Sequence, residues 1–265
     1  MGSGVEAFST ERGAVLPFPV IQAHQVHGDR VARVYMDGPD LMAAPVVSGG
    51  EGCIEPSSGQ CWGSVRTDKE RDIPEVLVGI DALITDVPGA AIGARTADCI
   101  PVLLHDPVHH AVAAVHAGWR GTVARISSKV LAAMSECYCS DPKDILAVIG
   151  PGIGPKSFQV GREVADAFVS AGFDMSEILI DEGPLCALPS DIVQPSRQQE
   201  PRSMRGGLHI DLWRANELTL TESGVPPRQI CVSGIDTYLA ADQFYSARRE
   251  TIACPRIINA VMLLP

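Results

Sequence analysis

Apolar residues recur along this chain with two spacings, one typical of strands and one typical of helices. Short runs rich in Val, Ile, Leu and Ala predict strands, and apolar positions three and four residues apart predict helices. Strands are expected within residues 24–34, 81–86, 90–97, 99–105, 110–116, 145–154, 229–236 and 256–265, and helices within 122–138, 161–172 and, after a short strand, 209–224. Paired strands followed by helices, without a regular strand–helix–strand repeat, favour an α+β fold.

A β-hairpin is predicted in the middle of the chain. Two apolar runs, "CIPVLLH" and "HAVAAVH", flank "DPVH", whose Asp-Pro pair is typical of a tight turn. Paired residues in an antiparallel hairpin have a constant sum of positions, so if His105 pairs with His110, Cys99 lies opposite His116 on the same face, with Cβ atoms about 5 Å apart. A slip of one residue would separate them. Pro101 cannot donate to the ladder, which predicts an edge strand or a bulge.

Cys99 and His116 suggest two kinds of chemistry. A thiolate and an imidazole at this separation can share a metal ion such as zinc, or they can act as a nucleophile and its base. His27, in "QVHG", would complete a His/Cys/His set. Three protein ligands with a fourth position open are the pattern of catalytic zinc sites, whereas structural sites use four. Nothing local brings His27 to the hairpin, and a lone histidine at a strand end is also a common structural residue.

Two further residues near the hairpin are candidates. Asp98 precedes Cys99, and either it is a hydrogen-bonded structural carboxylate or it orients a metal ligand. Arg120, in "GWRG", lies where a strand is expected to turn into a helix. Its guanidinium and nearby backbone N–H groups could bind a phosphate, or Arg120 could be a surface residue stacked on Trp119.

Composition and charge restrict the class of protein. The 265 residues are 46% hydrophobic and 20% charged, which is typical of a globular protein and suits one large domain or two small ones. A net charge of −11 argues against nucleic acid or an anionic membrane as a partner. No apolar run is long enough for a membrane span, and the first residues lack the pattern of a secretory signal. We therefore expect a cytoplasmic protein with small-molecule partners.

Six segments, in order along the chain, together resemble one known family. They are "QVHG", "DALITD", "TADCIPVLLHDP", "VAAVHAGWRGT", "AVIGPGIGPKSFQVGREV" and "FYSARRE". Each is only moderately specific, but the six in this order, from about residue 8 to the C-terminus, strongly resemble the bacterial laccase-domain family. Members of that family are described as multicopper polyphenol oxidoreductases, and later as purine nucleoside phosphorylases with adenosine deaminase activity.

The resemblance implies a fold and a metal site. Its zinc ligands are the histidine of the first motif, the cysteine of the third and the histidine of the fourth, which here are His27, Cys99 and His116. The implied fold is an α/β/β/α sandwich of mixed sheets within the α+β class, related to a cysteine-hydrolase toxin fold. It would form a single domain over residues 1–265 and a monomer.

The chain departs from the family pattern in two places. Members usually carry a longer N-terminal region with an Asn-Arg pair ahead of the first motif, and that pair has no counterpart here; Arg12 aligns better with an earlier family arginine. The stretch 48–75, rich in Gly, Ser and charge, is longer than usual and is expected to be a surface loop or a small excursion. Residues 181–207, which contain four prolines, are expected to be a second irregular stretch. These departures concern phosphate binding and substrate range more than the metal site.

The implied function is a zinc-dependent purine nucleoside phosphorylase with an adenosine deaminase side activity. Its substrates would be adenosine, inosine or guanosine together with phosphate, and an open position on zinc could activate water for attack on purine C6. The expected catalytic residues are Cys99, His116, Arg120 and Asp98.

Three alternatives stay open at this point. A copper-dependent polyphenol oxidase would need several close copper ions with many histidine ligands, and the chain has seven histidines, three of them at one turn. Copper can nevertheless compete for a His/Cys/His site, because the affinity order favours copper over zinc. The others are a metal-free hydrolase with Cys99 as nucleophile and His116 as base, and a non-enzymatic small-molecule binder.

Overall fold

An eight-stranded mixed sheet forms the centre of the molecule. The structure, a computed structural model, describes residues 4–16, 18–46, 63–64, 77–181 and 207–265. The strand order is β13-β10-β8-β9-β6-β3-β4-β5. The strands are β3 (Val31–Asp37), β4 (Asp40–Val46), β5 (Gly63–Ser64), β6 (Ala82–Thr85), β8 (Ile100–Asp106), β9 (Ala111–Ala117), β10 (Leu146–Ile149) and β13 (Ile230–Val232).

A four-stranded sheet with the order β1-β14-β7-β2 packs against one face of the larger sheet. Its strands are β1 (Val5–Ser9), β2 (Ile21–Gln22), β7 (Ile92–Thr96) and β14 (Ile257–Leu263). A separate two-stranded ribbon consists of β11 (Leu179–Asp181) and β12 (Leu208–Ile210).

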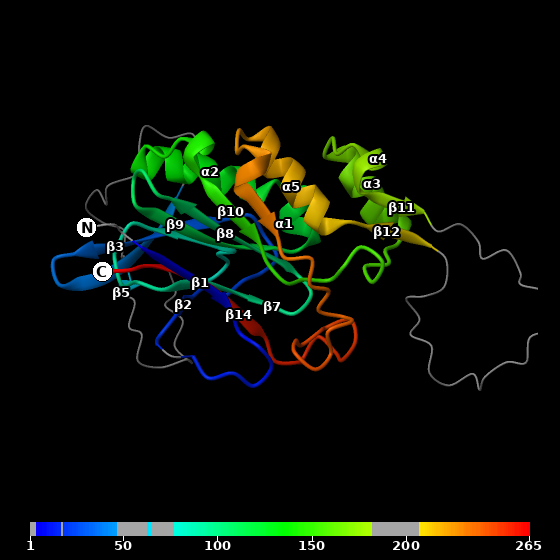
Figure 1. Cartoon of the computed structure of the whole chain (residues 1–265), viewed down its shortest axis with the longest axis horizontal. Coiled ribbons are helices and arrows are strands. Elements are labelled where there is room, and N and C mark those ends of the chain that lie inside the picture. The colour runs from blue at the N-terminus through cyan, green and yellow to red at the C-terminus, as the bar shows by residue number, and fades with distance from the viewer. Residues whose placement is uncertain (1–3, 17, 47–62, 65–76, 182–206) are drawn as a thin grey trace, which may run out of the picture.

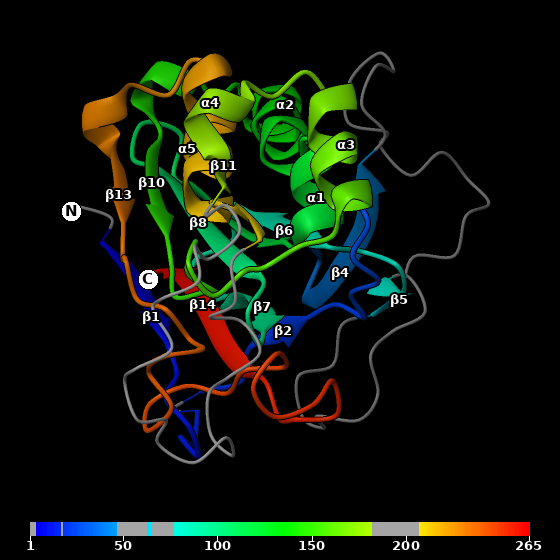
Figure 2. The same ribbon diagram turned by 90° about the vertical axis from the view of Figure 1, so that its right-hand side faces the viewer.

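The helices lie on the other face of the eight-stranded sheet (Figure 1). They are α1 (Trp119–Val123), α2 (Ile126–Tyr138), α3 (Arg162–Ser170), α4 (Met175–Ile178) and α5 (Leu212–Glu222), with short 3₁₀ turns at Pro142–Asp144 and Pro227–Gln229. Seen from the side, α2 and α5 lie next to each other above the sheet (Figure 2). The mixed α+β class with mixed sheets is confirmed, and the described helices form one layer, while loops follow the outer face of the four-stranded sheet (Figure 1).

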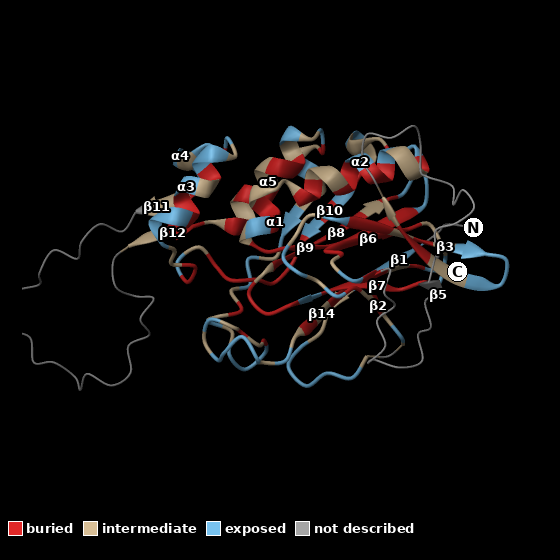
Figure 3. Cartoon of the chain, turned by 180° about the vertical axis from the view of Figure 1, so that it is seen from behind, coloured by how far each residue is buried: buried red, intermediate tan, exposed pale blue. Residues whose placement is uncertain are grey.

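The buried strand β9 shows why the layers form. All seven of its residues are buried (Figure 3). Ala113 and Val115 belong to the apolar cluster beneath the helices, whereas Val112 and Ala114 belong to the cluster between the two sheets. A strand covered on both faces is apolar throughout instead of alternating, which explains the continuous "AVAAV" run.

The expected helix 122–138 is interrupted in the structure. Arg125 adopts a left-handed conformation with φ of 58°, which separates α1 from α2. Its guanidinium lies 3.7 Å from the centre of the Phe173 ring and forms an ion pair with Glu222 at 2.5 Å. The helix is therefore broken at a residue whose side chain makes tertiary contacts, and the apolar spacing alone does not indicate this break.

The hairpin forms, but its register differs by two positions from the expected one. His116 pairs with Pro101, and His105 pairs with Val112. The turn is one residue further along than expected because Asp106 stays in the strand, where its Oδ1 accepts the backbone N–H groups of Val108 and His109. An even shift keeps every side chain on its face.

Pro101 does not mark an edge strand, because β8 lies between β10 and β9. The β10 ladder begins only at Val102, which pairs with Ile149, and the Pro101 carbonyl accepts the Gly150 N–H at 2.9 Å. The N–H that proline lacks thus falls just beyond the paired segment. The expectation of an edge or a bulge is wrong for this reason.

The two expected irregular stretches fall almost wholly outside the described residues. Of the stretch 48–75, the structure describes only Gly63–Ser64, which pair with β4. Of the stretch 181–207, it describes the two end residues. Among the described helices, none is long and apolar enough to cross a membrane.

Candidate metal centre

His27, Cys99 and His116 meet at one end of the sheets. Their candidate ligand atoms all lie within 4.8 Å of one another. His27 comes from the loop between β2 and β3, Cys99 directly precedes β8, and His116 is in the last part of β9. The two imidazole rings lie edge to face with centroids 4.9 Å apart. The tertiary fold thus brings His27 to the hairpin, as the family resemblance implied.

Two glycines of the "HAGWRG" motif allow this close approach. A Cβ at Gly118 would lie 3.1 Å from Cys99 Sγ and 3.1 Å from His27 Cδ2. A Cβ at Gly121 would lie 2.9 Å from the Gly28 carbonyl oxygen. The start of helix α1 therefore packs directly on the segments that carry Cys99 and His27, and a side chain at either glycine would have to displace its neighbours.

Asp81 holds the site together, although no motif in the sequence marks it as a site residue. Its Oδ1 lies 2.9 Å from His116 Nδ1 and accepts the His27 backbone N–H at 2.9 Å, while its Oδ2 accepts the Gly28 backbone N–H at 2.8 Å. The carboxylate is fully buried, and His116 is 3% exposed. An Nδ1–H donated to Asp81 leaves His116 Nε2 with its lone pair free, as metal-ligating histidines require.

His27 needs such support because its backbone is unusual. It has a φ of 62°, in the left-handed region that non-glycine residues seldom adopt. The Asp81 carboxylate accepts the backbone N–H groups of His27 and Gly28, which stabilises the turn. An aspartate just before a buried strand, followed by "ALIT", was the only local signal for this role.

The ligands interact strongly with one another. Burial raises the pKa of the Cys99 thiol, but the charge and hydrogen bond of His116, with the hydrogen bond of His27, outweigh burial and lower the pKa to about 6. Burial lowers the pKa of His116, but the Cys99 thiolate and the Asp81 carboxylate raise it to about 9. The site thus favours a thiolate, which is the form of cysteine that binds metals and acts as a nucleophile.

Asp98 lies next to the site without belonging to the ligand group. Its Oδ1 accepts the Thr237 hydroxyl at 2.8 Å, and its Oδ2 accepts the Ser246 hydroxyl at 3.0 Å and the Arg248 backbone N–H at 2.7 Å. Asp98 has a φ of 83° and is 8% exposed. Its carboxylate therefore fixes the C-terminal loop beside Cys99, and Asp81 is the carboxylate that orients the candidate ligand His116.

The "GPGIG" segment forms the neighbouring wall. The Ile153 N–H donates to the Asp98 carbonyl at 2.8 Å, and a Cβ at Gly152 would lie 3.1 Å from that carbonyl oxygen and 3.3 Å from that of Cys99. These glycines allow the chain to pack on the backbone that carries Cys99. They do not form a phosphate-binding Walker loop, whose Gly-Lys-Ser/Thr ending is absent.

Arg120 is exposed and stacks on its neighbour Trp119, with 4.3 Å between the guanidinium carbon and the ring centre. No carboxylate of the described residues lies within ion-pair distance of it. The stacked arrangement is the structural alternative expected from the sequence, and it leaves the N–H groups of the guanidinium available to an anion.

The trio is chemically suited to a metal ion. Two imidazoles and one thiolate, with one imidazole oriented by a buried carboxylate, are ligands typical of zinc and also acceptable to copper. In the described part of the chain no other group of three His, Cys, Asp or Glu side chains brings its ligand atoms this close together. All seven histidines are among the described residues, and together they contribute to one such centre and not to several neighbouring centres.

This fold and this site define a family. Residues 10–264 match the family described as multi-copper polyphenol oxidoreductase laccase, and the chain belongs to it.

Curated relatives carry two other names. The chain is 43% identical to "Purine nucleoside phosphorylase" of Bacteroides thetaiotaomicron over 71% of its own length, and it covers 63% of that protein, a little less than two thirds. It is 33% identical to "Adenosine deaminase RL5" of an unknown prokaryotic organism, over 97% of this chain and 94% of that protein.

Solved structures share the fold. A hypothetical protein YfiH from Bacillus licheniformis superposes with a TM-score of 0.67 at 25% identity, covering 92% of this chain and 73% of that one. YlmD from Geobacillus stearothermophilus has a TM-score of 0.56 at 29% identity, covering 72% of this chain and 63% of that one.

Proposed function

We propose that this protein is a zinc-dependent purine nucleoside phosphorylase with adenosine deaminase side activity. The observation that carries the proposal is the His27, Cys99 and His116 centre, oriented by Asp81, in a chain whose relatives are named for these two activities. Adenosine, inosine and guanosine, with phosphate, are the proposed substrates.

In phosphorolysis a phosphate oxygen attacks C1′ of the ribose. The bond from C1′ to the purine nitrogen breaks, and the base leaves with the electron pair and takes up a proton. A site for this reaction must hold an anion beside the sugar. Arg120 is the proposed phosphate-binding residue, because its guanidinium is exposed and lies on the helix that follows Gly118, which contacts Cys99 and His27.

His27, Cys99 and His116 would hold the metal, which when bound supplies a Lewis acid suited to activating water for deamination. Asp81 keeps the Nδ1 proton of His116 in place, so that this ring offers its other nitrogen to the metal. Gly118 and Gly121 allow the α1 helix to close over the ligands.

A polyphenol oxidase function has less physical support. Transfer of electrons from a phenol to oxygen through several copper ions needs several neighbouring metal sites. The described residues, which include every histidine of the chain, bring together one group with three candidate ligands. Copper bound at this single site would explain phenol oxidation that depends on metal loading.

A metal-free hydrolase is a second candidate, favoured by one observation. Asp81 Oδ1 lies 2.9 Å from His116 Nδ1, and a ring nitrogen of His116 lies within 4.8 Å of the Cys99 sulfur, which is the order of an orienting acid, a base and a cysteine nucleophile. The same side chains cannot bind a metal and act as nucleophile and base together, so metal loading discriminates between the two functions.

The deciding experiment is a substrate panel on protein of known metal content. Zinc-loaded, copper-loaded and chelator-treated samples receive adenosine, inosine or guanosine, with and without phosphate, and the products are separated by chromatography. The proposal expects ribose 1-phosphate and free base only with phosphate, and inosine from adenosine without it, both from the zinc form. Absence of nucleoside turnover by the zinc form, with phenol oxidation proportional to copper, would support the oxidase instead. Hydrolysis that survives chelation would support the metal-free candidate.

A further inference from the structure

Arg248 is an exposed cation attached to the candidate site. Its backbone N–H donates to Asp98 Oδ2 at 2.7 Å, one residue before Cys99. Its Nη1 donates to the Gln159 carbonyl at 2.9 Å, and its guanidinium carbon lies 5.6 Å from the Phe158 ring centre. No carboxylate of the described residues forms an ion pair with it.

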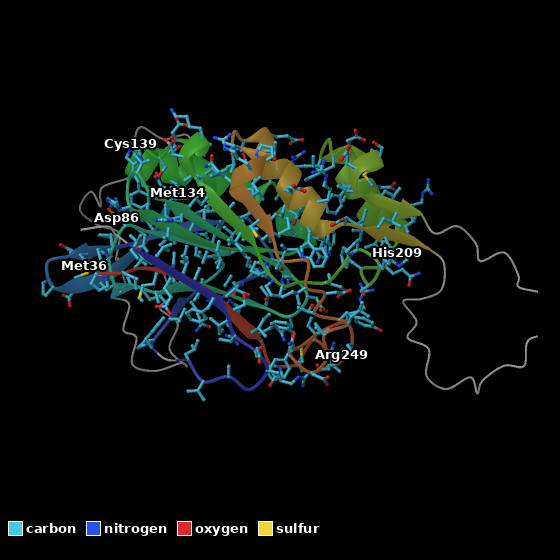
Figure 4. All side chains as sticks on the ribbon, viewed as in Figure 1. Met36, Asp86, Met134, Cys139, His209 and Arg249 are labelled. Carbon is cyan, nitrogen blue, oxygen red and sulfur yellow. The ribbon has the colours of Figure 1, made fainter. Side chains whose placement is uncertain are left out.

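The guanidinium of the next residue, Arg249, is bound quite differently. The Arg249 guanidinium donates to the carbonyls of Thr237, Tyr238 and Phe244 and pairs with Glu250. All these partners lie within the C-terminal loop, where Figure 4 shows Arg249 below the sheets. Of two adjacent arginines, one builds the loop, and the other keeps most of its N–H groups available.

The contacts of Arg248 fix it along one wall of the site. The segment from Gly152 to Gln159 starts against the backbone of Cys99, where Ile153 donates to the Asp98 carbonyl. Arg248 spans the same segment, with its backbone held at Asp98 and its guanidinium at Gln159. Its side chain therefore extends from the neighbour of a metal ligand along this wall.

Arg120 and Arg248 come from different elements, one packed on Cys99 and the other bound to the residue before it. Arg120 lies two residues after Gly118, where a Cβ would be 3.1 Å from Cys99 Sγ, and Arg248 is held by Asp98, the residue before Cys99. Neither guanidinium forms an ion pair with a carboxylate of the described residues, although the chain has a net charge of −11. Arginine presents several N–H donors in a plane, which suits oxyanions.

We propose that Arg248 binds the phosphate substrate together with Arg120, and that Asp98 is the positioning residue that holds Arg248 in place. The choice of phosphate as the anion rests on the proposed function, whereas the binding of a tetrahedral oxyanion by Arg248 does not. In this proposal Asp98 acts by holding the loop that carries Arg248, and not by orienting a metal ligand.

The test is calorimetric titration of zinc-loaded protein with inorganic phosphate, without nucleoside. Arg248→Ala should raise the Kd for phosphate by roughly tenfold or more, because a charge-assisted hydrogen bond is lost. Arg248→Lys should restore part of the affinity, since charge returns without the planar donors. Arg228→Ala is the matched control, because Arg228 is exposed at the far end of β13 from the site, and it should bind phosphate as the parent protein does.

Asp98→Asn tests the positioning role. The amide is neutral, so even with its oxygen at the Oδ2 position it is a weaker acceptor for the Arg248 N–H and the Ser246 hydroxyl than the carboxylate, and the Kd for phosphate should rise while zinc content stays near one per chain. A metal measurement and thermal unfolding of each variant distinguish this from general damage. Zinc loss together with lower affinity in Asp98→Asn would make Asp98 a support of Cys99 and overturn its assignment to Arg248.

The outcomes separate this inference from the proposed function. Phosphate affinity unchanged in Arg248→Ala overturns the inference even if nucleosides are phosphorolysed, and so does a parent protein that binds no phosphate. Affinity reduced in Arg248→Ala, in a protein that turns over no nucleoside, leaves the inference standing and removes the proposed function.

Discussion

Asp81 Oδ1 lies 2.9 Å from His116 Nδ1, and the same oxygen accepts the His27 backbone N–H at 2.9 Å. One buried carboxylate thus orients one candidate ligand and fixes the turn that presents a second. Burial raises the pKa of Asp81, but its bonds to His116 and to the Gly28 N–H lower the pKa below its usual value, so the carboxylate stays ionised.

The first prediction concerns this carboxylate. Asp81→Asn should raise the Kd for zinc by about 10- to 100-fold, the usual effect of removing the acid behind a ligand histidine. An amide would also present N–H to the Gly28 N–H, which loosens the His27 turn. Competition with a fluorescent chelator measures the Kd. Asp86→Asn, at the other end of β6 and far from Arg249 in Figure 4, is the control and should leave it unchanged. Equal zinc affinity in Asp81→Asn would contradict the orienting role.

Removal of the thiolate should empty the metal site without unfolding the protein. Cys99→Ser is expected to reduce bound zinc sharply from about one per chain, because two imidazoles remain. The core of some 50 buried apolar residues does not depend on a metal, so the unfolding temperature should change little. Elemental analysis and calorimetry measure the two effects. Cys139→Ser, at an exposed free thiol, is the control. Full zinc occupancy in Cys99→Ser would show that Cys99 is not a ligand.

A methyl group at Gly118 should separate the ligands. Gly118→Ala adds a Cβ 3.1 Å from both Cys99 Sγ and His27 Cδ2, at a φ of −66° that alanine adopts without strain. We expect a weaker zinc affinity with only a small loss of stability, since the backbone is unaffected. Spectra of the cobalt-substituted protein should show a weakened sulfur-to-metal charge-transfer band. An unchanged band and affinity would mean that the ligands tolerate the displacement.

The pH dependence of thiol reactivity follows from the lowered pKa of Cys99. In chelator-treated protein, alkylation of Cys99 by iodoacetamide should be half-maximal near pH 6. The folded state favours the thiolate, so reactivity persists above this pH and is lost as the pH falls through it. Peptide mass spectrometry resolves Cys99 from the other cysteines. In His116→Gln the midpoint should move upward, because burial remains while the charge that opposes it is gone. A midpoint that does not move in this variant would show that His116 does not stabilise the thiolate.

Arg120 should affect one of the two proposed reactions more than the other. Arg120→Ala is expected to slow phosphate-dependent release of base by roughly 10- to 150-fold, since a charge-assisted contact contributes about 1.5 to 3 kcal/mol. Deamination of adenosine, which uses no phosphate, should be less affected. Rates of the two products from one substrate give the ratio directly. Equal loss of both would make Arg120 a structural residue, through its stacking on Trp119.

The sequence by itself determined the elements and the candidate ligands. Apolar runs and spacing located β8, β9 and β14 and most of the helices, because local periodicity follows directly from which faces are buried. The motifs around His27, Cys99 and His116 identified the trio through family resemblance, although spacing alone could not show that the three residues meet.

Tertiary structure decided what depends on contacts between distant residues. The register of the hairpin followed from the two amides that Asp106 accepts at the turn, and the central position of Pro101 followed from where β10 stops. The role of Asp81 arises from partners 35 and 54 residues away, and that of Asp98 from a loop 150 residues further along. A single sequence does not encode such partners in any local pattern, because burial of a carboxylate is stabilised by whichever donors the fold brings to it.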